Sequence, residues 1–233
     1  MTAIPFSLEA VCGCVPSTVV DNRALLAELV GAAKADAIVN TANPRPVIGS
    51  GTDSAIYAAA GEERLLAERK KIGDIDPGCA ISTPAFNLGA KYIIHTVGPA
   101  WIDGSHGERE TLRSCYAQSL ALAAELACES IAFPMIATGV YGFPKDEALR
   151  IALSAIADFL LTHEMRVTLV VFDRVVSSNP AFKKYWLLHS IEEPQAEGSS
   201  FTVRRTLNGD SGRLQCDVLL PSADNLRLSK VGG

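Results

Sequence analysis

Apolar residues recur along the chain in two patterns, one typical of strands and one typical of helices. Short, nearly continuous apolar runs predict strands at Ala37–Val39, Cys79–Thr83, Tyr92–Val97, Ile131–Ile136 and Arg166–Phe172. The last run is the most continuous, which is typical of a strand buried in the centre of a parallel sheet. Weaker patterns predict short strands near Leu8–Val11 and Thr18–Val20.

Apolar residues spaced three and four positions apart predict helices between these strands. The predicted helices are Asn22–Ala35, Asp53–Ala60, Glu62–Lys71, Glu108–Ala127, Lys145–His163 and Asn179–His189. Strands that alternate with helices favour an α/β fold, in which helices cover both faces of a mostly parallel sheet.

The character of the sequence divides the chain into three parts. Residues 1–35 are mixed, and we expect them to pack on the domain or to extend it. Residues 36–190 contain the alternating strands and helices and form the predicted domain. Residues 191–233 begin with a linker-like stretch and continue as a polar segment with several glycines, which predicts a flexible tail.

The composition is that of an ordinary globular protein, with 233 residues, 48% of them hydrophobic, and a formal net charge of −5. This charge argues against broad, charge-driven binding to nucleic acid. No apolar run has the length of a membrane-spanning helix. The six cysteines lack the density of a disulfide scaffold and the spacing of a metal site. We therefore expect a cytoplasmic monomer without a metal or another cofactor.

Polar residues gather after the predicted strand Ala37–Val39. Asn40 and Asn43 follow the strand, and the loop Gly49-Ser50-Gly51 leads to Asp53 at the start of the next helix. Parallel sheets bind ligands at the carboxyl ends of their strands. Glycines let backbone N–H groups approach an anion closely. The segment therefore predicts a site for a phosphate-containing ligand.

A second glycine turn follows the predicted strand Ile131–Ile136. It reads Ala137-Thr138-Gly139-Val140-Tyr141-Gly142-Phe143 and again precedes a helix. Two such loops on one sheet edge are suited to holding a diphosphate between two sets of backbone N–H groups. Neither loop is a Walker motif, and the first loop lacks the third glycine of a dinucleotide fingerprint.

These motifs resemble those of the macro domain family. The matching segments, in family order, are Asp36–Asn43, Gly49–Ile56, Tyr92–Pro99 and Ile131–Pro144. The resemblance implies a three-layer α/β/α fold that binds ADP-ribose at the carboxyl ends of the strands. The chain looks most like the MacroD-type branch, whose members hydrolyse ADP-ribose from modified proteins.

The resemblance also implies roles for single residues. Asn43 would hold the hydroxyls of the distal ribose, and Asp53 would orient or activate the water that attacks the anomeric carbon. Both glycine loops would carry the diphosphate, with Tyr141 and Phe143 shaping the distal ribose pocket. The family usually has a Gly-Asp-Ile-Thr turn whose Asp receives the adenine amino group. That turn is absent from this sequence, and Asp21 is the best substitute.

Several of these residues have a second interpretation. Asn43 either binds the ribose or forms a turn before Pro44. Thr138, Gly139 and Gly142 either bind the ligand or form an ordinary turn.

Four other residues also have two interpretations. Asn40 either contacts the ligand or forms hydrogen bonds at the strand end. Asp53 either acts on the substrate or only caps its helix. Asp21 either receives adenine or only begins a helix, and Phe172 either stacks on adenine or packs in the core.

Two other polar groups have an ordinary explanation. His95 lies in an apolar strand, where we predict a core histidine with its hydrogen bonds satisfied. The run Arg69-Lys70-Lys71 ends a predicted helix, and we expect its charges to be solvated.

Motifs and resemblance together predict a macro domain that hydrolyses ADP-ribose from mono-ADP-ribosylated proteins at acidic residues. A single acid, with no second general acid nearby, fits a carboxylate leaving group better than an amide or a guanidine. The expected partner is ADP-ribose or an ADP-ribosylated protein. Two alternatives stay open: a reader that binds ADP-ribose without turnover, and an O-acetyl-ADP-ribose deacetylase.

Overall fold

The structure, a computed structural model, describes residues 6–12, 35–171, 214–215 and 218–219. Its strands are β1 (Phe6–Cys12), β2 (Ala37–Thr41), β3 (Ala80–Pro84), β4 (Tyr92–Thr96), β5 (Ser130–Pro134), β6 (Arg166–Val171), β7 (Leu214–Gln215) and β8 (Val218–Leu219). Its helices are α2 (Thr52–Ala60), α3 (Glu62–Ile72), α4 (Glu108–Glu125) and α5 (Lys145–Leu160). None of these helices is both long enough and apolar enough to cross a membrane.

The strands form one mixed sheet in the order β3-β4-β2-β5-β6-β1-β7, and β8 also pairs with β1. β3 runs antiparallel to β4, whereas the other paired strands are parallel. β1 places residues from the beginning of the chain beside β6. The predicted mostly parallel sheet is therefore confirmed, while the division of the chain at residues 35 and 190 stays a prediction.

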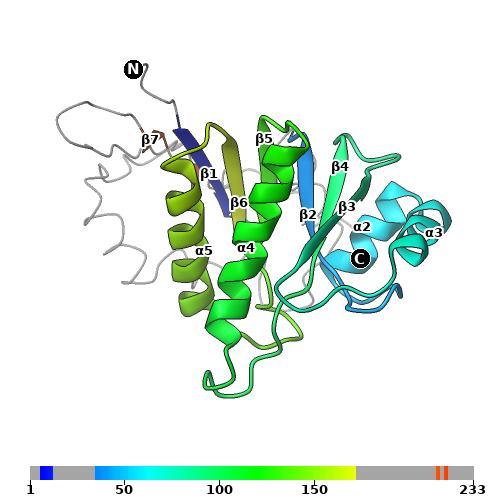
Figure 1. Cartoon of the computed structure of the whole chain (residues 1–233), viewed down its shortest axis with the longest axis horizontal. Helices are drawn as coiled ribbons and strands as arrows, with labels where there is room; N and C mark the ends of the chain where they lie inside the picture. Colours follow the sequence, from blue (N-terminus) through cyan, green and yellow to red (C-terminus); the bar gives the residue numbers. More distant parts are fainter. Residues whose placement is uncertain (1–5, 13–34, 172–213, 216–217, 220–233) are drawn as a thin grey trace, which may run out of the picture.

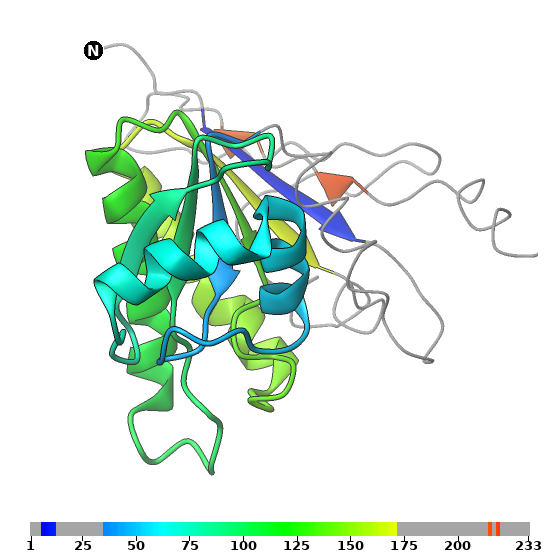
Figure 2. The same ribbon diagram turned by 90° about the vertical axis from the view of Figure 1, so that its right-hand side faces the viewer.

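Helices cover both faces of the sheet because neighbouring residues of a strand point to opposite faces. Val39 and Phe133 belong to a core that the sheet forms with α4 and α5. Ile38 and Ala132 belong to a second core with α2 and α3. Figure 1 shows α4 and α5 in front of the sheet, and the turned view of Figure 2 brings α2 and α3 to the front. The three-layer α/β/α fold is thus confirmed.

The predicted elements of the described region are all present, with ends that differ by a few residues. The largest difference is at α5, which ends at Leu160 instead of His163. β2 continues to Thr41 and so includes Asn40. The short strand expected near Leu8–Val11 is confirmed as β1. The predicted strand Thr18–Val20 and the helices Asn22–Ala35 and Asn179–His189 lie outside the described residues, apart from Ala35.

Gly98 lies where the segment after β4 passes the turn after β5. A Cβ atom at this position would lie 2.9 Å from Ile136 Cγ2 and 3.0 Å from Ala137 Cβ. Real Cβ contacts are longer, so one of the two segments would have to move. Gly98 therefore permits the close contact of the two segments.

We predict that Gly98→Ala lowers the free energy of unfolding by about 1–3 kcal/mol, because the extra methyl overpacks this contact. Urea denaturation measures the change. The matched control is Gly139→Ala, since a Cβ there meets nothing within 4 Å; its effect should stay within about 0.5 kcal/mol. If the two variants are equally stable, the segment after β4 and the turn after β5 can move apart without a loss of folding free energy.

Candidate functional site

The two glycine loops lie at the same edge of the sheet. β2 and β5 are neighbouring parallel strands, so the loops that follow them begin side by side. The segment after β4 begins at this edge too, because β4 is the other parallel neighbour of β2. All three loops lie at the lower end of the molecule in Figure 1. The topology thus brings together the two motifs that the sequence places about 90 residues apart.

Asp53 joins the first loop to the sheet. Its Oδ2 accepts a hydrogen bond from the Gly49 N–H at 2.6 Å, and its Oδ1 accepts one from Asn40 Nδ2 at 2.6 Å. The N-cap of α2 is Gly51, and Asp53 lies in the first turn without capping it. The capping interpretation is therefore wrong: the carboxylate binds the loop backbone and a strand amide instead of the helix end.

The environment of Asp53 changes its acidity. The carboxyl is almost completely buried, and this burial raises its pKa above the ordinary value. The hydrogen bonds from Asn40 and Gly49 and the charge of Arg69 act in the opposite direction, without cancelling the effect of burial. Asp53 is thus a stronger base than an exposed aspartate, which suits a group that receives a proton from water.

Asn40 connects Asp53 to a chain of buried polar groups. Its Nδ2 also lies 3.1 Å from His95 Nδ1, and His95 Nε2 lies 2.9 Å from Thr83 Oγ1. Because the amide nitrogen donates, His95 Nδ1 accepts, and its proton sits on Nε2 toward Thr83. Burial, with the charge of Arg69, lowers the pKa of His95 to about 3, so the ring stays neutral. The predicted core histidine is confirmed.

The buried position of Asn40 favours the second of its two interpretations. The side chain is fully buried, and both of its established partners belong to the protein. Its Oδ1 has no hydrogen-bond partner among the described residues. Asn40 thus orients Asp53, and a contact between Asn40 and a ligand stays a prediction.

Asn43 lies in the loop after β2 and is only partly buried. Its side-chain Oδ1 accepts a hydrogen bond from the Arg45 N–H at 3.2 Å, which forms a turn at the start of the loop. The carbonyl of Asn43 faces the guanidinium of Arg69, with Nη2 at 3.5 Å. Sequence reasoning placed Arg69 on a solvated helix end, but its side chain is only 1% exposed. The prediction is therefore wrong for Arg69, whereas Lys70 and Lys71 are exposed as expected.

The remainder of the first loop, Gly49 to Gly51, is suited to a ligand that approaches the backbone closely. Gly51 has a φ of 67°, which favours glycine. A Cβ on Gly49 would lie only 3.2 Å from Asp53 Oδ2, so glycine leaves room for the hydrogen bond between these residues. Ser50 is exposed between them.

The second loop is held by its own backbone. The Phe143 N–H donates to the Ala137 carbonyl at 3.0 Å, and the Gly142 N–H donates to that of Gly139 at 2.9 Å. Ala137 adopts a φ of 62°, which is uncommon for a residue other than glycine. Thr138 Oγ1 donates to the Met135 carbonyl at 3.2 Å. These bonds close a compact turn.

The side chains of the second loop divide into exposed and buried groups. Val140 is 88% exposed, and Tyr141 is partly exposed. Phe143 is buried and meets Trp101 edge-on, with ring centroids 4.7 Å apart. The Trp101 N–H also donates to the Tyr141 carbonyl at 2.8 Å. Trp101, which contacts this loop through its ring and its backbone N–H, was missed in the sequence analysis.

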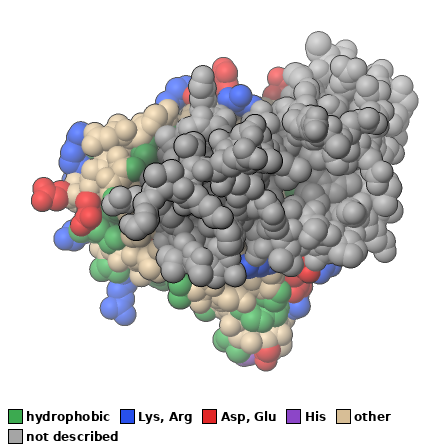
Figure 3. Space-filling model, turned by 180° about the vertical axis from the view of Figure 1, so that it is seen from behind, with side chains coloured by type: hydrophobic (Ala, Val, Ile, Leu, Met, Phe, Trp, Pro, Cys, Tyr) green, Lys and Arg blue, Asp and Glu red, His purple; other side chains and the backbone are tan. Residues whose placement is uncertain are grey.

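Exposed apolar side chains occur on each of the three loops at this edge. They are Val47 after β2, Ile102 after β4 and Val140 after β5. Figure 3, which shows the molecule from behind, has hydrophobic side chains at its lower end. The predicted residues Asp21 and Phe172 lie outside the described residues, so their adenine contacts stay predictions.

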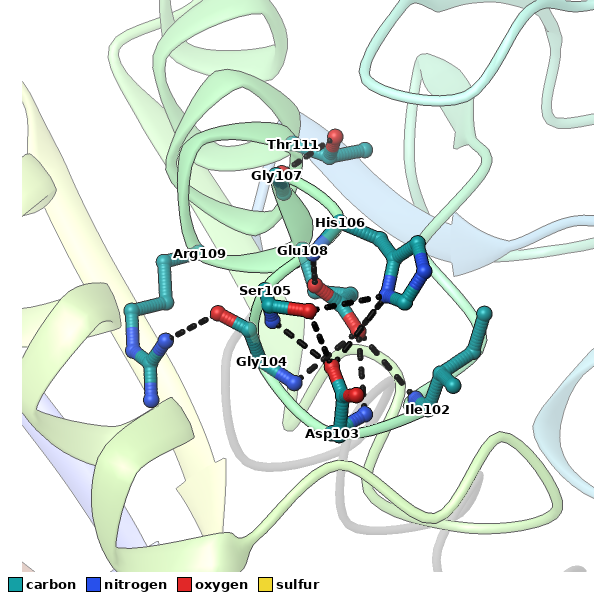
Figure 4. Close-up of polar contacts among 9 residues, drawn as sticks. All are labelled: Ile102, Asp103, Gly104, Ser105, His106, Gly107, Glu108, Arg109 and Thr111. Carbon is teal, nitrogen blue, oxygen red and sulfur yellow. Dashed lines mark hydrogen bonds and ion pairs between the residues drawn. The ribbon is translucent and has the colours of Figure 1, made fainter.

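One group of side chains in the described residues has the composition of a metal site. Asp103, His106 and Glu108 offer ligand atoms within 4.8 Å of one another. However, Glu108 accepts hydrogen bonds from the backbone N–H groups of residues 102, 103, 104 and 106 (Figure 4). Asp103 accepts bonds from Ser105 and His106. The cluster therefore organises the loop that leads into α4. Both carboxylate oxygens of Glu108 and Oδ1 of Asp103 already accept hydrogen bonds from this loop.

The fold and the site define a class of protein: a three-layer α/β/α domain with two glycine loops and a buried acid at the carboxyl edge of its sheet. The Macro domain family model matches residues 39–152. A macro domain-containing protein of Chlorobaculum tepidum is 45% identical over 137 residues, which are 59% of this chain and 78% of that protein. The chain belongs to the macro domain family.

Other relatives carry functional names. A protein of Citrobacter rodentium named O-acetyl-ADP-ribose deacetylase is 48% identical over 54% of this chain and 72% of its own length. The Oceanobacillus iheyensis macrodomain with ADP matches with a TM-score of 0.62 and 37% identity, over 68% of this chain and 87% of that one. The Trypanosoma brucei macrodomain in complex with ADP-ribose matches with a TM-score of 0.58 and 35% identity, over 65% of this chain and 63% of that one.

Glu108 gives a pH-dependent test of the loop before α4. Desolvation raises its pKa, but the backbone hydrogen bonds outweigh this effect and bring the pKa to about 2. The ionised form thus stabilises the fold above the ordinary pKa of glutamate, and this contribution is lost as the pH falls toward 2. We predict that Glu108→Gln lowers stability at pH 7 and flattens the loss of stability between pH 5 and pH 2.

Urea denaturation across this pH range measures the effect. Glu110→Gln is the matched control, because Glu110 is an exposed acid in the same first turn of α4. The control should follow the parent protein. If Glu108→Gln follows it too, the hydrogen bonds to Glu108 do not stabilise the loop.

Proposed function

We propose that this macro domain binds ADP-ribose and hydrolyses the bond between ADP-ribose and an acidic residue of a modified protein. The observation that carries the proposal is Asp53, a buried carboxylate held beside the first glycine loop by Asn40 and the Gly49 N–H. A domain that only binds ADP-ribose needs the loops but has no need for an acid of raised pKa at this place.

Two features support ADP-ribose as the ligand. The loops after β2 and β5 lie side by side and expose backbone at Ser50 and Gly139, where a diphosphate can approach. Solved structures of similar domains contain ADP or ADP-ribose. The half-buried Asn43 would then bind the distal ribose, next to Asp53.

The reaction needs only water and the protein's own groups. Water attacks the anomeric carbon of the distal ribose while the bond to the carboxylate oxygen breaks, through an oxocarbenium-like transition state. The carboxylate leaves with the bonding electrons, and the proton lost by water passes to Asp53 and then to solvent. Because a carboxylate is a good leaving group, no second acid is required.

A second candidate is deacetylation of O-acetyl-ADP-ribose. The names of relatives from Citrobacter rodentium and Escherichia fergusonii favour it. This substrate has the same nucleotide and an ester on the same ribose, so Asp53 would direct water at the acyl carbon instead. Both reactions hydrolyse an ester of ADP-ribose, and parallel assays separate them.

We predict that ADP-ribose raises the thermal stability of the protein and that Gly139→Glu abolishes this effect. A saturating ligand should stabilise the fold by about 2–4 kcal/mol. A side chain at Gly139 enters open space, so the variant should fold, while its charge repels the diphosphate. Calorimetry with ADP-ribose measures binding.

Ala121→Glu is the control for this experiment. It adds the same charge on an exposed position near the end of α4, at the opposite edge of the sheet. This variant should bind like the parent protein. Tight binding by folded Gly139→Glu would show that the second loop does not hold the diphosphate, and no response of the parent would refute ADP-ribose as the ligand.

We predict that Asp53→Ala lowers turnover by about 10²-fold or more, because it removes the group that activates water. The affinity for ADP-ribose should change less, since the phosphates and Asn43 provide most of the contacts. The assay follows release of ADP-ribose from proteins modified on Asp or Glu, on Ser and on Arg. A separate assay follows release of acetate from O-acetyl-ADP-ribose.

The control here is Glu110→Ala, another acid in the first turn of a helix, which should keep parental turnover. Circular dichroism checks folding, because Asp53→Ala leaves the Asn40 amide and the Gly49 N–H without their acceptor. Parental turnover in a folded Asp53→Ala variant would exclude Asp53 from the reaction. A parent protein that binds ADP-ribose but cleaves no substrate would be a reader.

A further inference from the structure

Arg69 is a buried cation behind the candidate site. It is among the largest fully buried side chains of the described residues, while its neighbours Lys70 and Lys71 are exposed. Arginine is almost never fully buried without partners, because removing its charge from water is costly. A buried Arg69 therefore needs partners inside the protein, which a solvated helix end would not need.

The contacts of Arg69 link α3 to the first loop. Its Nη1 donates to the carbonyl of Gly73 at 2.9 Å, and its Nη2 faces that of Asn43 at 3.5 Å. Burial raises the pKa of Tyr57 on α2, and the nearby guanidinium acts in the opposite direction. One planar group thus joins the end of α3 to the residue expected to bind the ribose.

The charge of Arg69 also acts on Asp53. Within the described part of the chain, no carboxylate forms an ion pair with Arg69, but its charge lowers the pKa of Asp53, against the larger effect of burial. The other polar groups facing Asp53 are Asn40, the Gly49 N–H and Tyr57. Asn40 and Gly49 are neutral donors, and His95, behind Asn40, stays neutral. Among the described residues, Arg69 is therefore the cation that acts on Asp53.

We propose that Arg69 is a positioning residue of this site, whose buried guanidinium fixes the backbone of Asn43 and whose charge acts on the Asp53 carboxylate. This inference rests on the proposed function, because it assumes that Asn43 and Asp53 act on a bound ADP-ribosyl group. Arg69 itself does not contact the substrate. Its effect passes through the Asn43 carbonyl and through the electric field at Asp53.

Three variants separate the two effects. R69M removes both the charge and the donors, R69K keeps a charge but lacks the planar fork, and K70M changes the exposed neighbour as the matched control. Two readouts need no turnover: the Kd for ADP-ribose from calorimetry, and the midpoint at which the Asp53 carboxyl titrates, from its carbon-13 resonance. The titration midpoint of Asp53 responds to nearby charge. A merely structural role of Arg69 would not alter this midpoint.

We expect R69M to weaken ADP-ribose binding about tenfold and to move the Asp53 midpoint upward. R69K should keep the midpoint near that of the parent but bind about threefold more weakly, because an ammonium does not reproduce the fork. K70M should change neither quantity.

Each part of the inference has an outcome that overturns it. Folded R69M that binds ADP-ribose like the parent overturns the positioning of Asn43, and an unchanged midpoint overturns the action on Asp53. If R69M does not fold, R69K with parental affinity overturns the positioning. A parent that binds ADP-ribose without cleaving any substrate refutes the proposed hydrolysis alone, since neither readout depends on it.

Discussion

The pair of hydrogen bonds that Asp53 accepts is the constraint on which the site depends. One comes from Asn40 on β2 and the other from the Gly49 N–H in the loop, while Asp53 itself belongs to α2. A single carboxylate thus fixes a strand, a loop and a helix relative to one another. Both partners are donors, so the geometry requires two accepting oxygens and favours the ionised form. Burial opposes ionisation, and the raised pKa reflects this conflict.

The polar groups behind Asp53 form a cluster in which each member depends on the next. His95 can accept from Asn40 only as the tautomer with its proton on Nε2, and this N–H then donates a hydrogen bond to Thr83 Oγ1. Burial, with the charge of Arg69, keeps His95 neutral, and the same charge favours the ionised form of Asp53. Buried polar clusters seldom stabilise a fold more than apolar packing does. Their value here is in holding one carboxylate in one orientation.

Periodicity was sufficient to predict β1 to β6 and helices α2 to α5, because each of these elements has an apolar face that meets a core. It did not predict the two-residue strands β7 and β8, which are too short to show a period and lie in the segment predicted as a tail. Local motifs also located both glycine loops. Arg69 was missed because its burial depends on how the end of α3 docks against the loop of Asn43, a contact between distant parts of the sequence. The run Arg69-Lys70-Lys71 gives no sign that only its first member turns inward. Asp53 was difficult for a related reason: an acid in a first helical turn has the same pattern whether it caps the helix or binds a preceding loop.

The two loops obtain their shape from different sources, and this difference has a chemical consequence. The second loop is held by its own backbone and by the packing of Trp101 on Phe143, and its hydrogen bonds within the described part of the chain involve no titratable group. The first loop is held by the carboxylate of Asp53. When Asp53 takes up a proton, one of its oxygens becomes a donor and the bond to Gly49 or to Asn40 weakens. A reaction in which Asp53 receives the proton of water would therefore loosen the first loop at the moment of bond cleavage, while the second loop keeps its shape.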